Sequence, residues 1–182
     1  CSSDLYGEPR PFQYFISHGD PALIDNVREG RKQEFAAFHA AGEAPDPQSE
    51  TTFTDSKLQW ELGKTGKQGQ LRAFYQELLR LRREQPALAH LDNASLTATV
   101  IAPGVLEVRR WCNESRVAVW MNFSAKPATV TVQPGSGAWR KVLDAADLQW
   151  GGEGSALPTA WTDGNLPKAL TLSAYAVVVY AI

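Results

Sequence analysis

The chain has 182 residues, a formal net charge of −2, 43% hydrophobic residues and 21% charged residues. This composition is ordinary for a folded globular protein and excludes a disordered tail. The small net charge gives no electrostatic reason to expect a nucleic acid or an anionic membrane as a partner. The most apolar stretch, residues 174–182, is far shorter than the roughly 20 residues that a membrane-spanning helix needs.

Neither the beginning of the chain nor its cysteines and histidines indicate a particular activity. No signal peptide pattern opens the sequence, so we expect a cytoplasmic protein. Residues 1–5 resemble one reading frame of a sequencing adapter, and we expect them to be a non-native scar. The two cysteines, and the histidines at positions 18, 39 and 90, lie too far apart in sequence to form a local metal-binding pattern.

Residues 6 to about 90 are predicted to be mainly helical. Asp20-Pro21 is typical of a helix start, because Asp caps the first amides and Pro lacks a donor. We expect Gly30 to separate two short helices, and Gly42–Thr54 to be a loop.

A longer helix is predicted from about Gln68 to Glu84, with Pro86 stopping it. One of its faces is apolar over most of its length and includes Phe74 and Leu78. Such a face must be buried, and we expect a sheet outside this chain to cover it more than the β domain does.

From Leu96 onward the hydrophobic pattern changes to a period of two, which predicts short antiparallel strands packed as a sandwich. The last strand is apolar on both alternating sets, so we expect it to be central. The predicted strands are residues 97–101, 105–112, 116–123, 128–132, 139–143, 169–172 and 175–182.

Several blocks of residues 6–90 occur in an order that resembles the malto-oligosyltrehalose trehalohydrolases of the α-amylase superfamily. These blocks are Pro11-Phe12-Gln13-Tyr14-Phe15, Val27-Arg28-Glu29-Gly30-Arg31, Pro45-Asp46-Pro47-Gln48, Ser56-Lys57-Leu58-Gln59-Trp60 and Leu79-Arg80-Leu81-Arg82-Arg83-Glu84. Ser17-His18-Gly19-Asp20 departs from the Thr-Asp-His order of that family. The β part resembles the family only in kind.

The resemblance implies an α+β chain in which residues 6–90 are the helical tail of a (β/α)8 barrel, after its eighth strand, and residues 91–182 are an antiparallel C-terminal β-sandwich. It implies a retaining glycosidase that acts on maltooligosyltrehalose and releases trehalose without a metal or cofactor. Its nucleophile Asp, acid/base Glu and third Asp would lie on barrel strands upstream of Cys1. The chain would then contain no catalytic residue and would be inactive without the rest of the barrel.

Four residues are candidates for binding. Tyr14, Phe15 and His18 follow the predicted end of barrel strand eight, where the active sites of such barrels lie. Tyr14 and Phe15 would either stack on a glucose ring or pack at the rim of the barrel, and we favour packing. Trp120 alternates with Val117 and Val119, so we expect it on the outer face of the sandwich, either against glucan or against the barrel.

Other interpretations stay open at this stage. In one alternative, the β domain is an accessory α-glucan-binding module that holds sugar through Trp111, Trp120 or Trp161. In another, the parent is a related branching enzyme of the same superfamily. Asp144 and Asp147 are expected to close a turn and not to form a catalytic pair, because no base accompanies them.

Overall fold

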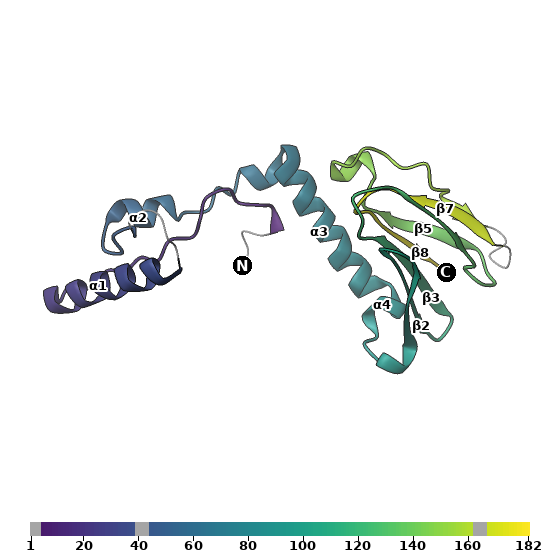
Figure 1. Ribbon diagram of the computed structural model, residues 1–182, viewed down its shortest axis with the longest axis horizontal. Helices are drawn as coiled ribbons and strands as arrows, with labels where there is room; N and C mark the ends of the chain where they lie inside the picture. Colours follow the sequence, from purple (N-terminus) through teal and green to yellow (C-terminus); the bar gives the residue numbers. More distant parts are fainter. Residues whose placement is uncertain (1–4, 39–43, 162–166) are drawn as a thin grey trace. The chain divides into compact units, whose positions relative to one another are not determined.

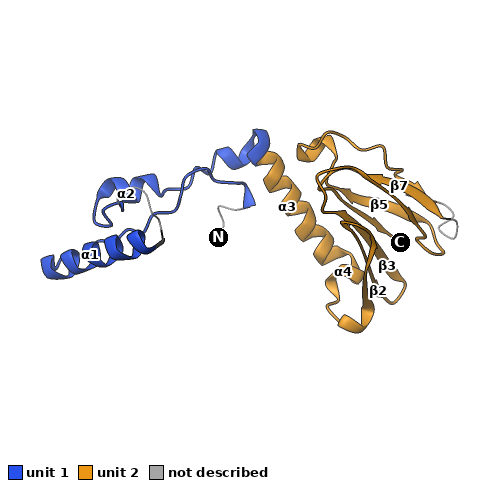
Figure 2. Ribbon diagram, viewed as in Figure 1, with its two compact units in different colours: residues 1–68 blue, residues 69–182 orange. Residues whose placement is uncertain are grey.

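The computed structural model describes residues 5–38, 44–161 and 167–182, so Cys1–Asp4 and His39 lie outside the described residues. The chain divides into two compact units, residues 1–68 and residues 69–182 (Figure 2). None of the described helices is long and apolar enough to cross a membrane. The helices are α1 (Pro21–Phe38), α2 (Glu50–Asp55), η2 (Leu62–Lys64), α3 (Gly66–Glu84), α4 (Pro86–Ala89), η3 (Asn93–Ser95) and η4 (Leu148–Trp150) (Figure 1). The strands are β1 (Leu96–Ala102), β2 (Val105–Cys112), β3 (Ser115–Asn122), β4 (Ala128–Val132), β5 (Trp139–Asp144), β6 (Ala160–Trp161), β7 (Lys168–Leu172) and β8 (Val177–Ala181).

Helix α1 begins as predicted but is not interrupted. The Asp20 carboxylate accepts a hydrogen bond from the Ala22 amide at 2.9 Å, which confirms the cap. The predicted break at Gly30 is wrong, because α1 continues through it to Phe38. A glycine inside a helix costs only about 0.5–1 kcal/mol relative to alanine. The Gln33 amide bonds Glu29 across this position at 3.2 Å.

Helix α2 lies inside the predicted loop 42–54, which is therefore wrong in its second half. The Pro-rich part of that stretch ends at Pro47. Ser49 then caps the helix by accepting from the Thr51 amide at 3.3 Å, and Glu50 occupies the first turn. A Ser cap followed by an acidic first turn is a helix start that the Gly and Pro content of the preceding residues obscured.

Helix α3 confirms the predicted long helix and extends it by two residues at its start. Pro86 does end α3, but it also opens the one-turn helix α4, in which it occupies the first turn. Proline suits that position because the first amides of a helix have no acceptor within the helix.

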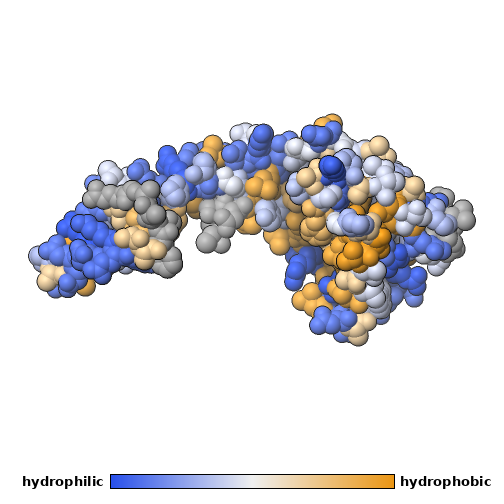
Figure 3. Space-filling model, in the orientation of Figure 1, coloured by the Kyte–Doolittle hydropathy of each residue, from blue (hydrophilic) through white to orange (hydrophobic). Residues whose placement is uncertain are grey.

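Residues 69–182 contain the β domain, whose strands form two antiparallel sheets. The larger has the order β1-β2-β3-β8-β5-β6, and the smaller pairs β4 with β7. All seven predicted strands are confirmed, and β8 is central as predicted, between β3 and β5. Strand β6 was not predicted, since only Ala160 and Trp161 pair with β5. On the face seen in Figure 3, hydrophobic residues gather mainly over this domain.

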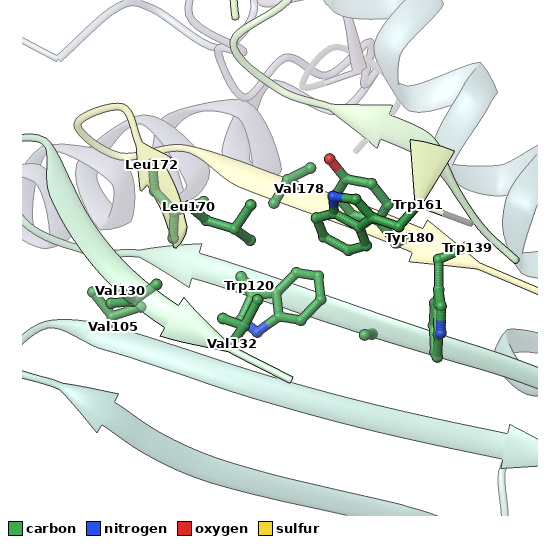
Figure 4. Close-up of a cluster of buried hydrophobic side chains, with 11 residues drawn as sticks. Val105, Trp120, Val130, Val132, Trp139, Trp161, Leu170, Leu172, Val178 and Tyr180 are labelled. Atoms are coloured by element: carbon green, nitrogen blue, oxygen red, sulfur yellow. The ribbon is translucent and has the colours of Figure 1, made fainter. Parts of the chain in front are cut away.

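One hydrophobic core lies between the two sheets (Figure 4). It is rich in aromatic rings: Trp161 stacks on Tyr180 with centroids 4.0 Å apart, and Trp120 meets both rings edge-on. Aliphatic side chains of β4 and β7 close the other side. These are Val130, Val132, Leu170 and Leu172.

A second core lies on the opposite face of the larger sheet, where α3 and α4 cover it. Phe74, Leu78 and Leu81 of α3 pack there with Val117 of β3 and Val179 of β8. The β domain therefore covers Phe74, Leu78 and Leu81, whereas Tyr75 and Leu79 of the same helix are exposed, and cover of these two by a sheet outside this chain stays a prediction. Both faces of β3 and β8 are buried as a result, and this is the reason for the correction to Trp120 given below.

Candidate functional site

The aromatic segment Phe12–His18 is extended and is held by the residues around α2. The Ile16 amide donates to the Pro47 carbonyl at 2.8 Å. The Ser56 hydroxyl accepts from the Gln13 amide at 3.0 Å and lies 3.2 Å from its carbonyl. The Gln48 side chain bonds both backbone groups of His18, its amide donating to the carbonyl at 3.1 Å. The segment is thus paired along its length, although it belongs to no sheet.

Glu8 anchors the start of this segment. Its carboxylate accepts from the Gln59 amide at 2.7 Å, the Tyr6 hydroxyl at 3.0 Å and the Arg10 amide at 3.2 Å. The bond from the Gln59 amide is the largest of the effects that lower the pKa of Glu8. Tyr6 is buried, and its ring lies so close to Gly63 that a Cβ there would stand 3.2 Å from it.

A pocket of about 480 Å³ opens beside the segment. Phe15 and Phe53 form an apolar wall, with ring centroids 5.0 Å apart in an edge-to-face arrangement. Phe12 lies 6.1 Å from Phe15 and is 79% exposed, which is unusual for a Phe side chain. The pocket is lined by Phe15, Ile16, Ser17, Gln48, Ser49, Glu50 and Phe53.

The three predicted residues of this segment do not all reach the pocket. Phe15 lines it, but Tyr14 does not, and its ring lies under the Arg31 guanidinium at 5.0 Å. His18 is exposed and is held through its backbone.

Gln48, Glu50 and Phe53 line the pocket and were not predicted as site residues. The signal that would have found them is the helix start at Ser49, because Gln48 directly precedes this cap and Glu50 and Phe53 follow it in α2.

Trp120 does not lie on the surface. It is 0% exposed, and its indole N–H donates to the Glu107 carboxylate at 2.7 Å. The predicted alternation of β3 is correct, since Val117 and Val119 pack towards the helices. The inference of an outer face is wrong, because the smaller sheet covers the side that carries Trp120. Trp161 is also buried, whereas Trp111 is 38% exposed.

The acidic residues of β5 and its turn have structural roles. The Lys141 ammonium lies 3.0 Å from Asp144 and 3.6 Å from Asp147, and Asp144 also accepts from the Ala146 amide at 3.1 Å. This confirms the predicted turn. Among the residues that the structure describes, no group of three His, Cys, Asp or Glu side chains could hold a metal ion.

The residues that line the pocket are suited to binding a ligand. Ring faces beside an amide, a hydroxyl and a carboxylate suit a ligand that has both apolar faces and hydroxyl groups. Glu50 is the single carboxylate in the pocket lining, whereas retaining glycoside hydrolysis needs two, about 5–5.5 Å apart.

Known proteins match the β part of the chain and also longer stretches of it. Residues 93–179 match the family described as a domain of unknown function, DUF3459. A malto-oligosyltrehalose trehalohydrolase from Rhizobium sp. (strain M-11) is 36% identical over 144 residues, which are 79% of this chain and 24% of that enzyme. The one from Deinococcus radiodurans is 45% identical over 89 residues, which are 48% of this chain and 15% of that enzyme.

The fold has a counterpart among solved structures. A proposed alpha amylase from Salmonella typhimurium superposes with a TM-score of 0.64 and 28% identity, covering 98% of this chain and 27% of that one. The chain thus spans about a quarter or less of the length of the curated relatives that it matches. Its helices followed by an antiparallel β domain correspond to the C-terminal part of such structures. This chain is therefore homologous to the C-terminal region of malto-oligosyltrehalose trehalohydrolases, within the α-amylase family.

Proposed function

We propose that this chain is the C-terminal part of a retaining glycosidase that cleaves the α-1,4 bond next to the terminal trehalosyl unit of maltooligosyltrehalose and releases trehalose. The catalytic carboxylates would come from barrel strands that precede residue 1 in the parent enzyme. In this proposal residues 6–90 complete the barrel, and residues 91–182 are its C-terminal β domain.

One observation carries the proposal: the identity to a trehalohydrolase extends over 144 residues, more than either compact unit contains. A match of that length does not fit within the β domain alone and includes at least part of the helical unit. The Phe12–His18 segment supports it further, because its hydrogen bonds hold aromatic side chains exposed to solvent.

The proposed role of the pocket is to hold a glucose residue of the substrate. The Phe15 and Phe53 rings would contact the apolar face of the sugar, and Gln48 and Glu50 would bond its hydroxyl groups. Such contacts contribute binding and orientation, which raise kcat/KM without supplying a reacting group.

The decisive experiment uses the full-length parent enzyme with maltooligosyltrehalose, and with a linear glucan as a second substrate. We expect free trehalose from the first and no new α-1,6 branches in the second. Branch formation without trehalose release would contradict the proposal and indicate a branching enzyme. The 182-residue chain by itself should release no trehalose.

The pocket is tested separately in the parent enzyme. Phe15→Ala should lower kcat/KM for maltooligosyltrehalose about tenfold, since an aromatic contact is worth roughly 0.5–1.5 kcal/mol beyond its buried area. The matched control is Leu23→Ala, which truncates a side chain of similar exposure on α1. Equal kinetics for the two variants would remove the pocket from the proposal.

A further inference from the structure

A second groove lies in the β domain, where β2 and β3 meet the loop that leads into β5. Its volume is about 130 Å³, well below the roughly 300–1,000 Å³ of pockets that enclose a whole ligand. This size fits one ring resting on the wall. The lining residues are Arg109, Arg110, Trp111, Arg116, Val117, Pro134 and Trp139.

Side-chain hydrogen bonds to the backbone and to Glu107 hold the groove in shape. The Arg109 guanidinium donates to the Glu107 carboxylate at 2.8 Å and to the carbonyls of Pro134 and Gln133 at 2.8 and 2.7 Å. The indole N–H of Trp139 donates to the Gly135 carbonyl at 3.1 Å. The loop is therefore fixed from two sides, and a ligand would find the wall preorganised.

Two side chains at the groove are free to bind a ligand. Trp111 and Arg116 are register partners on β2 and β3, so their side chains emerge on the same face. Trp111 is 38% exposed, and the Arg116 guanidinium is exposed and has no partner among the residues that the structure describes. An exposed indole beside an unpaired five-donor group, on a rigid wall, is a binding arrangement that folding does not require.

The placement of the guanidinium groups argues against a phosphate or another polyanion as the ligand. Arg109 is paired with Glu107, and the Arg110 guanidinium bonds the His90 carbonyl beside α4, on the opposite face of the strand. On the face of Trp111, Arg116 is the guanidinium that has no partner among the described residues, so the groove offers one exposed indole and one set of donors. A neutral pyranose has the matching features, namely a flat C–H face with hydroxyl groups at its edge.

We propose that this groove binds a glucose residue of an α-glucan, as a second contact separate from the Phe15 pocket. The Trp111 ring contacts the sugar face beside the buried Trp139, and Arg116 donates to the hydroxyl oxygens of the sugar. The choice of α-glucan among neutral sugars rests on the proposed function. The site would keep a long chain attached while its end reacts elsewhere.

The test titrates the full 182-residue chain with maltoheptaose by calorimetry, with cellopentaose as the β-linked comparison. We expect binding of maltoheptaose that Trp111→Ala weakens about tenfold. Arg116→Gln should weaken it several-fold and leave the fold intact, because Arg116 pairs with Ile182 through its backbone. Phe123→Ala is the control, since it removes another exposed aromatic side chain from the same domain.

The two proposals fail separately in this experiment. Loss of maltoheptaose binding in Phe15→Ala, with Trp111→Ala unchanged, would overturn the second site and leave the proposed function standing. If maltoheptaose binding depends on Trp111 but the parent enzyme releases no trehalose, the second site stands and the proposed function is overturned. Equal affinity for cellopentaose would overturn the assignment to α-glucans.

Discussion

Glu8 connects the beginning of the helical unit to the loop before η2. Its carboxylate accepts hydrogen bonds from Tyr6, Arg10 and Gln59, and the backbone amide of Gln59 contributes most to lowering the pKa of Glu8 below the ordinary Glu value. A group whose pKa is lowered by folding stabilises the folded form above its unfolded pKa. That contribution is lost as the pH falls through the folded pKa. The anchor should therefore hold at neutral pH and release in acid.

Glu8→Gln should loosen residues 5–18 at pH 7, because a neutral amide is a weaker acceptor for these donors. Amide hydrogen exchange of this segment should be faster in the variant at pH 7, and the difference should shrink as the pH falls through the lowered pKa of wild-type Glu8, below the ordinary Glu value. Glu61→Gln is the control, because the Glu61 side chain is exposed and its ion pair is with the nearby Lys64. An equal difference at every pH would contradict a charge-dependent anchor.

At the scale of the elements, two glycines show how backbone conformation acts within a helix and at its start. α1 passes through Gly30, and nothing lies within 4 Å of the position that a Cβ would take there. Gly66, at the start of α3, has equally open space but a φ of +59°. The two glycines therefore differ in conformation and not in packing, which makes them a matched pair.

Gly30→Ala should stabilise α1 by about 0.5–1 kcal/mol, because alanine loses less backbone entropy on entering a helix. Gly66→Ala should destabilise the chain by a similar amount or more, since a residue with a Cβ is strained at positive φ. Urea unfolding followed by circular dichroism at 222 nm measures both. Opposite shifts are expected, and shifts of the same sign would contradict this account.

At the scale of the whole molecule, the β domain is organised around β8. This strand pairs with β3 on one side and β5 on the other, and both of its faces are buried. Tyr180 of this strand donates its hydroxyl to the Pro158 carbonyl at 2.5 Å, and burial raises the pKa of the Tyr180 hydroxyl. Opening β8 would therefore require both cores to separate.

Amide exchange should consequently be slowest in β8, at the rate set by global unfolding of the β domain. The edge strand β1 should exchange faster, because it pairs on one side and its centre is exposed. Two-dimensional NMR in deuterated solvent distinguishes them. Equal protection of β1 and β8 would show that the domain opens only as a whole.

The sequence by itself determined the change from helical to strand period, the long α3 helix, seven strands and the central place of β8. These features depend on spacing within about twenty residues, where apolar periodicity and turn chemistry act directly. The same reasoning missed α2 because Gly and Pro residues preceded its cap. It also predicted a break at Gly30, where a side-chain hydrogen bond between Glu29 and Gln33 spans the glycine within the continuous helix.

Only the tertiary structure decided which surfaces are free. Alternation assigned Trp120 to the face opposite Val117, but a period of two cannot tell whether a second layer covers that face. Here β4 and β7 cover it, while α3 covers the other, so Trp120 is buried whereas Trp111 is exposed. In the helical unit, likewise, hydrogen bonds between residues about 30–50 positions apart select Phe15 and not Tyr14 for the pocket. Burial depends on partners distant in sequence, and local patterns carry no information about them.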